Sequence, residues 1–484
     1  MWRLSARVLL AIAVLLPWAA RAAEDTAARY NKGVRLYQED KLAEATAEFE
    51  AVLAADAKDS TTMVWLAVIA LRQNNTARAI ELLEKATALK PDDGLAHNNL
   101  GNAYLQQNQV EPAVAAYRKA IAINPNYADA HYNLGIALAR QNDVDGAIAA
   151  YRAATKLNPN HAEYHNNLAN MLKAKGDLPG ALAEYRLARE KKPDDPVFMV
   201  NSGLALWEAD KSAEALSEFE AAARKQPDNA TAQLYRGMAY LKADRAADAV
   251  TALEEAVRLQ PDSFAAQFNL GLAHGRVGQE ESLRKALAAY QKALELKPDE
   301  VNALNNLGWV YFKLNDLDQA ATMFGKAVAA SPKMALAHNN LALLYTRQKD
   351  TAKAEAAWAQ VVELEAANTN AWVQLGEARY ALENWDGAQQ AFETAVKGGA
   401  RDPEVYNKLG LISEKNGQYE QAEAQFRKAL ELDPRYAIAY NNLGVALEKQ
   451  NKLDDAKKMY GKALELDPNY EHAKFNLSRL EGTE

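Results

Sequence analysis

A short motif returns along this chain at a fixed interval of 34 residues. HNNLG begins at His97, HYNLG begins at His131 and HNNLA begins at His165. Thirteen repeats of this length cover residues 26–470, and only the eighth, residues 264–300, is longer, by three residues that fall best at 279–281. Such a period in a chain of 484 residues indicates stacked copies of one small supersecondary unit instead of a single compact core.

Small residues mark two places in every repeat, numbered here from position 1 at Thr26 to position 34. Position 20 is alanine in all thirteen repeats, and position 8 is glycine in ten and alanine in three. Apolar residues recur at positions 4, 7, 8 and 11, a second apolar stripe follows position 20, and proline stands at position 32 in ten repeats. This pattern predicts two helices joined by a turn near position 15, with proline ending the second. Glycine inside a helix costs about 0.5–1 kcal/mol relative to alanine, so its repeated use predicts two backbones in close approach.

The order Leu-Gly, Tyr, Ala, aromatic, Ala and Pro at this period resembles the tetratricopeptide repeat family, across residues 26–470. The resemblance implies an all-α fold, a right-handed superhelical solenoid of thirteen helix–turn–helix repeats. Residues 471–484 are then expected to form a capping helix, with Phe475 and Leu477 facing the last repeat. The resemblance to the tetratricopeptide repeat family further implies that the first helices line a concave groove for a ligand.

Positions 2, 6, 9 and 13 form one stripe of the first helix, almost opposite the packing stripe. Position 6 is asparagine in most repeats, and the asparagines predicted to contact a ligand are Asn99, Asn133, Asn167, Asn201, Asn269, Asn306, Asn340 and Asn442. A primary amide can both donate to and accept from a peptide bond, so such a ladder can hold an extended segment. It resembles the asparagine ladder in the repeat domain of the O-linked N-acetylglucosamine transferases. The alternative is that these side chains only solvate the groove.

The other stripe positions predict apolar and basic contacts. Trp309 and Leu343 at position 9 are predicted apolar anchors, although contact between adjacent first helices explains them equally well. Position 13 is basic in eight repeats, and the predicted site includes Arg140, Arg276, Lys313 and Arg347. The favoured interpretation of these cations is their interaction with a helix C-terminus, and a basic track for acidic ligands is the alternative.

The sequence predicts no catalytic residue, metal site or cofactor. His97, His131, His165 and His338 share position 4, on the packing stripe, and lie one per repeat without cysteines beside them. They are therefore predicted to be packing residues. The repeats leave no room for a catalytic domain between residues 26 and 470, and no Gly-rich phosphate loop, H-E-x-x-H or G-x-S-x-G motif is present.

The N-terminal residues 1–22 have the form of a secretory signal peptide. MWRLSAR is basic, VLLAIAVLL is apolar, and Ala20-Arg21-Ala22 supplies a small-residue cleavage pattern before Ala23. Cleavage removes three arginines and leaves 53 basic against 64 acidic residues, a net charge of −11 that disfavours nucleic-acid binding. The mature chain has no apolar run of membrane-spanning length, so we expect an exported protein, periplasmic or secreted.

Together these features predict a non-enzymatic scaffold that binds extended segments of partner proteins in its groove. Assembly of an envelope or secretion complex is the expected setting. One alternative is a protein that binds or guides exopolysaccharide through groove aromatics and amides, and another is a solenoid that self-associates. The sequence does not name the partner.

Overall fold

The computed structural model describes residues 19–482, and this part of the chain contains 27 helices and no strand. The predicted all-α fold is confirmed. Residues 1–18, which hold most of the predicted signal peptide 1–22, lie outside the described residues. The chain divides into two compact halves between Ala243 and Asp244, and each half is described by itself.

In the N-terminal half the helices follow one another closely in sequence. They are α1 (Ala19–Gln38), α2 (Leu42–Ala55), α3 (Ser60–Arg72), α4 (Thr76–Leu89), α5 (Gly94–Gln106), α6 (Val110–Ile123), α7 (Ala128–Arg140), α8 (Val144–Leu157), α9 (Ala162–Ala174), α10 (Leu178–Lys191), α11 (Pro196–Glu208), α12 (Ser212–Lys225) and α13 (Ala230–Lys242). Odd-numbered helices are the first helices of the sequence repeats and even-numbered helices are the second.

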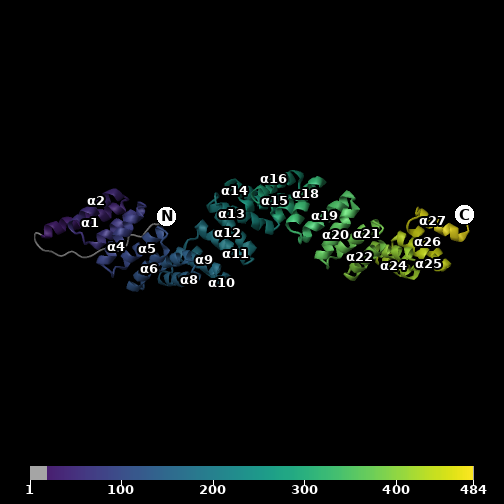
Figure 1. Cartoon of the computed structure of the whole chain (residues 1–484), viewed down its shortest axis with the longest axis horizontal. Helices are drawn as coiled ribbons and strands as arrows, with labels where there is room; N and C mark the ends of the chain where they lie inside the picture. The colour runs from purple at the N-terminus through teal and green to yellow at the C-terminus, as the bar shows by residue number, and fades with distance from the viewer. Residues whose placement is uncertain (1–18, 483–484) are drawn as a thin grey trace. The chain divides into compact units, whose positions relative to one another are not determined.

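The C-terminal half continues the same alternation. Its helices are α14 (Ala246–Leu259), α15 (Phe264–Val277), α16 (Glu280–Leu296), α17 (Val301–Lys313), α18 (Leu317–Ala330), α19 (Ala335–Gln348), α20 (Thr351–Leu364), α21 (Thr369–Ala381), α22 (Trp385–Lys397), α23 (Pro403–Lys415), α24 (Tyr419–Leu432), α25 (Ala437–Lys449), α26 (Leu453–Leu466) and α27 (Glu471–Glu481). Within each half every helix packs against its neighbours in sequence, as Figure 1 shows. The three extra residues of the eighth repeat lengthen α16 to 17 residues.

In nine of the hairpins an aromatic ring of the second helix lies on the glycine of the first helix. A Cβ added to Gly101 would meet Tyr117 Cε1 at 2.5 Å, and one added to Gly376 would meet Phe392 Cδ1 at 2.5 Å. The sequence-based expectation of two backbones in close approach is therefore wrong, because the space beside the glycine is filled by a side-chain ring. The position-20 alanines are at most 3% exposed, so they lie inside the same interface.

The turn between the two helices is set at position 15, where the backbone takes the left-handed conformation. Asn74 has φ 57°, Asn108 has φ 61° and Gly176 has φ 87°. Asn and Gly tolerate this region better than other residues, which explains their use there.

The last helix, α27, covers α26 only in part. Leu477 packs against the core formed with Leu443 and Tyr460, but Phe475 is 61% exposed, so the expectation that Phe475 faces the preceding repeat is wrong. Phe475 occupies position 5, which in earlier repeats contacts the helix that follows, and no described helix follows α27. None of the helices among residues 19–482 is both long and apolar enough to cross a bilayer.

Candidate functional site

The position-6 side chains form a hydrogen-bonded ladder between neighbouring first helices. In each case the position-6 side chain donates to the position-5 side chain 35 residues earlier, at 2.8–3.0 Å. The pairs are Trp65 to Tyr30, Asn133 to Asn98, Asn167 to Tyr132, Asn201 to Asn166, Asn340 to Asn305, Asn442 to Asn407 and Asn476 to Asn441. We call these pairs the cross-repeat ladder.

The predicted ligand-binding asparagines are accordingly less open than the sequence suggested. Asn99, Asn133 and Asn340 are at most 6% exposed. The other predicted ligand-binding asparagines are partly buried: Asn167, Asn201, Asn269, Asn306 and Asn442. Outside the ladder, Asn269 donates to its own helix at Ala265 O, 2.8 Å, and Asn306 donates to Tyr290 Oη at 3.4 Å. One amide donor of most of these residues is therefore already engaged within the protein.

Sequence reasoning missed the position-5 partners of this ladder. Asn98 and Asn305 are 2% and 3% exposed, so they lie beneath the position-6 stripe. The signal that could have found them is the repeated separation of 35 residues between two polar side chains, as from Asn98 to Asn133. A 34-residue period brings position 5 of one repeat beside position 6 of the next.

The position-4 residues make a second recurrent bond, to the carbonyl that precedes their helix. His97 Nε2 lies 3.0 Å from Pro91 O, and His131, His165 and His338 repeat this contact at 3.0 Å with a proline six residues earlier. Gln267 and Trp372 supply the same bond through Nε2 and Nε1, at 3.0 and 2.8 Å. The histidines hold the turn between repeats. No group of three His, Asp or Glu side chains among the described residues is arranged to bind a metal ion.

The environments of two of these histidines shift their pKa in opposite directions. The Glu184 carboxylate, 2.6 Å from Nδ1 of His165, raises the pKa of His165. His97 has no such carboxylate partner, and its burial lowers its pKa. Imidazole protonation therefore favours the folded state at His165 and opposes it at His97.

Two of the position-13 cations, Arg140 and Arg347, contact the end of the preceding first helix. Arg140 Nη1 donates to Leu105 O at 3.1 Å, and Arg347 donates to Phe312 O at 3.4 Å and to Asn315 Oδ1 at 2.8 Å. Cations stabilise the negative end of a helix dipole, which is the role that the sequence favoured for them. Arg276 is exposed on α15.

The stripe on α17 and α19 is partly open to solvent. Trp309 is 38% exposed and its ring stacks on Phe312 with centroids 5.3 Å apart and planes 17° apart. Lys313 Nζ lies 5.0 Å from the Trp309 ring centroid, and the Arg347 guanidinium lies 4.8 Å from that of Phe312. Leu336 and Leu343 of α19 are 53% and 36% exposed. We call Trp309, Phe312, Lys313, Leu336, Leu343 and Arg347 the aromatic–cationic surface.

Comparison with protein families places known repeat sequences along most of the chain. Profiles described as "Tetratricopeptide repeat" match residues 36–102, 70–117, 132–196, 200–250 and 237–278, and one described as "TPR repeat" matches residues 101–142. The profile of the cilia and flagella-associated protein 70 C-terminal domain matches residues 263–479. None of these profiles describes an enzyme. A comparison with curated proteins found no match.

Several solved structures are similar to parts of the chain. YrrB, described as a TPR protein with an unusual peptide-binding site, is 23% identical over 39% of this chain and 97% of its own, with a TM-score of 0.37. The Cut9–Hcn1 assembly of the APC/C is 16% identical over 96% of this chain and 91% of the matched chain, with a TM-score of 0.35. MamA from Desulfovibrio magneticus RS-1 is 25% identical over 36% of this chain and 96% of its own, with a TM-score of 0.33.

The family matches and the geometry agree on the unit from which the chain is built. The matched segments begin and end within the array of helical hairpins. Each hairpin carries the small residue and the buried alanine described above, and most carry the opposed aromatic ring. The helical hairpins of this chain are tetratricopeptide repeats.

Proposed function

We propose that this protein is an exported, non-enzymatic scaffold that binds an extended segment of a partner protein across the first helices of its repeats. The observation that carries the proposal is the aromatic–cationic surface. A tryptophan left 38% exposed and stacked on a second ring, together with two solvent-exposed leucines on the next first helix, has the composition of a binding hot spot. The tetratricopeptide fold supports protein binding in general terms.

The chemistry of this surface indicates a partner segment that carries both apolar and acidic side chains. The leucines Leu336 and Leu343 and the Trp309 ring offer apolar contact on adjacent helices. The Arg347 guanidinium group donates two hydrogen bonds within the protein. Because it has five N–H donors, the others remain for a carboxylate of the partner. A local group of cations on a chain of net charge −8 also distinguishes this surface electrostatically.

The cross-repeat ladder has a supporting part in this proposal. Asn340 lies on the same stripe as Leu336 and Leu343, and its bond to Asn305 fixes α19 against α17. A rigid spacing between the two helices lowers the ordering cost when a segment binds across them. Each amide also keeps a second N–H, which we propose to contact the bound backbone.

Binding is tested with synthetic acidic–apolar peptides and with crosslinked capture from the native envelope. We expect Trp309→Ala and Leu343→Ala each to weaken peptide binding by about tenfold or more while leaving melting nearly unchanged, because both side chains are exposed. The matched control is Leu466→Ala, which removes a leucine of equal exposure, 38%, from the second helix α26. Unchanged binding in the Trp309 and Leu343 variants contradicts the proposal. Loss of polysaccharide binding instead, with peptide binding intact, supports the carbohydrate alternative.

The proposed export and periplasmic location rest on the N-terminal sequence. We expect mass spectrometry of the protein from its native host to find an N-terminus at Ala23. Retention of residues 1–22 in that protein contradicts the cleavage.

A further inference from the structure

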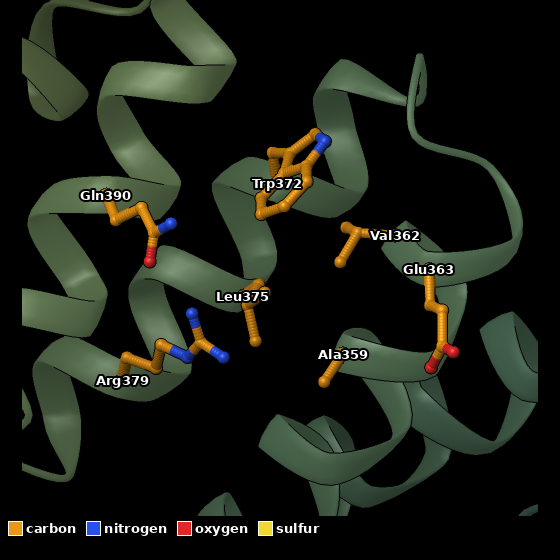
Figure 2. Close-up of a pocket in the computed structure, with 7 residues that line it drawn as sticks. All are labelled: Ala359, Val362, Glu363, Trp372, Leu375, Arg379 and Gln390. Atoms are coloured by element: carbon orange, nitrogen blue, oxygen red, sulfur yellow. The ribbon is translucent and has the colours of Figure 1, made fainter.

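A hollow of about 280 Å³ lies between α20, α21 and α22. Figure 2 shows its lining side chains, which are Ala359, Val362, Glu363, Trp372, Leu375, Arg379 and Gln390. Trp372, Leu375 and Arg379 occupy positions 4, 7 and 11, whereas the aromatic–cationic surface uses positions 2, 9, 12 and 13. The hollow is therefore on a different face of the first helices from the proposed binding surface, and it needs a separate explanation.

In two other repeats a tyrosine of the protein itself spans the equivalent place. The hydroxyl of Tyr104, at position 11, donates to Glu84 Oε1 of the preceding second helix at 2.6 Å. Tyr240 donates to Glu220 in the same way, also at 2.6 Å and across the same separation of 20 residues. The array thus has a recurrent arrangement in which a phenol ring spans from the first helix to position 25 of the helix before it.

Both members of this pair are replaced at the hollow. Position 11 is Arg379 and position 25 is Ala359, so neither a phenol ring nor its carboxylate partner is present. Arg379 turns instead to Glu355, with Nε 2.8 Å from Oε1, and to Gly387 O at 3.4 Å. The space that the ring would occupy is left open.

A second hollow supports this explanation of the first. It also measures about 280 Å³ and lies against α15 and α16, where position 11 is the smaller His274. His274 Nε2 stays 3.7 Å from Glu254 Oε1, beyond hydrogen-bond length. At both hollows position 11 is thus a residue other than tyrosine.

We propose that the hollow at Arg379 binds a tyrosine side chain presented by a partner polypeptide. The bound ring lies against Trp372, Leu375 and Val362, the last two of which are 1% and 6% exposed. Trp372 is a fixed wall because its Nε1–H donates to Ala366 O at 2.8 Å. The phenol hydroxyl accepts from a remaining N–H of Arg379 and donates to the Glu363 carboxylate, and the exposed Gln390 amide is placed to bond the partner's backbone.

The test uses N-acetyl-L-tyrosinamide as the probe and the full-length protein. We expect binding with a dissociation constant of roughly 1 mM, as for a small rigid ligand, with magnetisation transfer from the Trp372 indole to the phenol protons. N-acetyl-L-phenylalaninamide, which lacks the hydroxyl, should bind at least threefold more weakly. The variant Ala359→Glu with Arg379→Tyr restores the array's own pair and should abolish binding without lowering the melting temperature.

Three outcomes overturn the proposal. One is undiminished binding of the probe to the restored-pair variant, and another is equal binding of N-acetyl-L-leucinamide. The third is stronger binding of free 4-methylphenol than of the tyrosinamide, which would indicate a small phenolic ligand in place of a polypeptide. Magnetisation transfer to Trp372 is measured on the unaltered protein, so the proposal is tested even if the double variant folds poorly. This site is independent of the aromatic–cationic surface, and either can fail alone.

Discussion

Asn133 Nδ2 donates a buried hydrogen bond to Asn98 Oδ1 across two repeats, at a length of 3.0 Å. Asn98 is 2% exposed, so removal of its donor would leave a carbonyl oxygen without a partner and without water. We expect Asn133→Ala to lower the free energy of unfolding by about 1–3 kcal/mol. The double variant Asn98→Ala with Asn133→Ala should cost less than the sum of the two single changes.

These costs are measured by urea unfolding together with amide hydrogen exchange of α5 and α7, because unfolding of a repeat array need not be two-state. If the loss of unfolding free energy in the double variant equals the sum of the two single losses, the two amides do not interact. A large loss of peptide binding at unchanged stability in Asn133→Ala would instead assign this residue to the ligand.

Two glycines of helix α15 give a matched test of hairpin closure. A Cβ at Gly271 would meet the Tyr290 ring at 2.8 Å, whereas one at Gly275 would meet nothing within 4 Å. We expect Gly275→Ala to stabilise the protein by about 0.5–1 kcal/mol through helix propensity. Gly271→Ala gains the same propensity but forces the ring aside, with a net loss of about 1–2 kcal/mol. Thermal melting of both variants checks the prediction, and equal effects would contradict it.

His165 and His97 should give stability a dependence on pH of opposite sign. The pKa of His165 is raised by Glu184, so its stabilisation is complete below the unfolded pKa of about 6.5 and is lost as the pH rises through the raised value. The pKa of His97 is lowered by burial, so its contribution is present above about 6.5 and is lost as the pH falls.

Glutamine is the matched replacement for both, since Gln267 already makes the same bond to a proline carbonyl, at 3.0 Å. We expect the deficit of His165→Gln relative to wild type to shrink as the pH rises from about 6 to about 9. His97→Gln should lose less stability than wild type as the pH falls below about 6.5. Melting temperatures measured across this pH range test both expectations. If the melting temperatures of wild type and both variants change with pH in the same way, the assignment of the two histidines is wrong.

The joint between α22 and α23 lacks the contacts that recur elsewhere. Position 32 is Ala400 instead of proline, and the ladder position that should donate is Lys408, opposite the apolar Val373. The turn contains Gly399 with φ 99°. An ion pair takes the place of the ladder, because Lys408 contacts Glu377 and lies 3.2 Å from Glu404 Oε1.

We expect this joint to be sensitive to salt. Raising the ionic strength from about 50 mM to about 500 mM should lower its opening free energy by up to about 1 kcal/mol. Amide exchange in α23 would then accelerate relative to α25, whose ladder bond from Asn442 to Asn407 is uncharged. The double variant Val373→Asn with Lys408→Asn imports the ladder and should remove the salt effect. A salt effect of the same size in both helices would argue against a local ion-pair joint.

The helical hairpins were predictable from the sequence because their signals are local and repeated. The glycine at position 8, the alanine at position 20 and the 34-residue period define where each helix begins and packs. The packing assignment of the histidines follows from the same stripe, and His97 does make its bond within the protein.

The candidate site was less predictable, because a helical stripe states which residues face the same way and not which side chains bond to one another. The asparagine stripe predicted ligand contact, but Asn133 is bonded to Asn98, which a single-helix projection leaves on another face. Trp309 was predicted as an apolar anchor at position 9, and its role in binding stays a prediction. Its stacking on Phe312 depends on rotamers that the pattern does not contain. The hollow at Arg379 arises from two substitutions in different helices, which only their contact in space relates.

The cross-repeat ladder also bears on how such a chain can change over evolutionary time. Each rung joins one hairpin only to the next, across 35 residues. Duplication or loss of a whole repeat therefore keeps the 35-residue spacing at the new seam, whereas gain or loss of one residue within a first helix changes that spacing. The eighth repeat, whose three additional residues lengthen α16, has no rung on either side, because Asn269 donates to Ala265 O of its own helix and Asn306 donates to Tyr290 Oη.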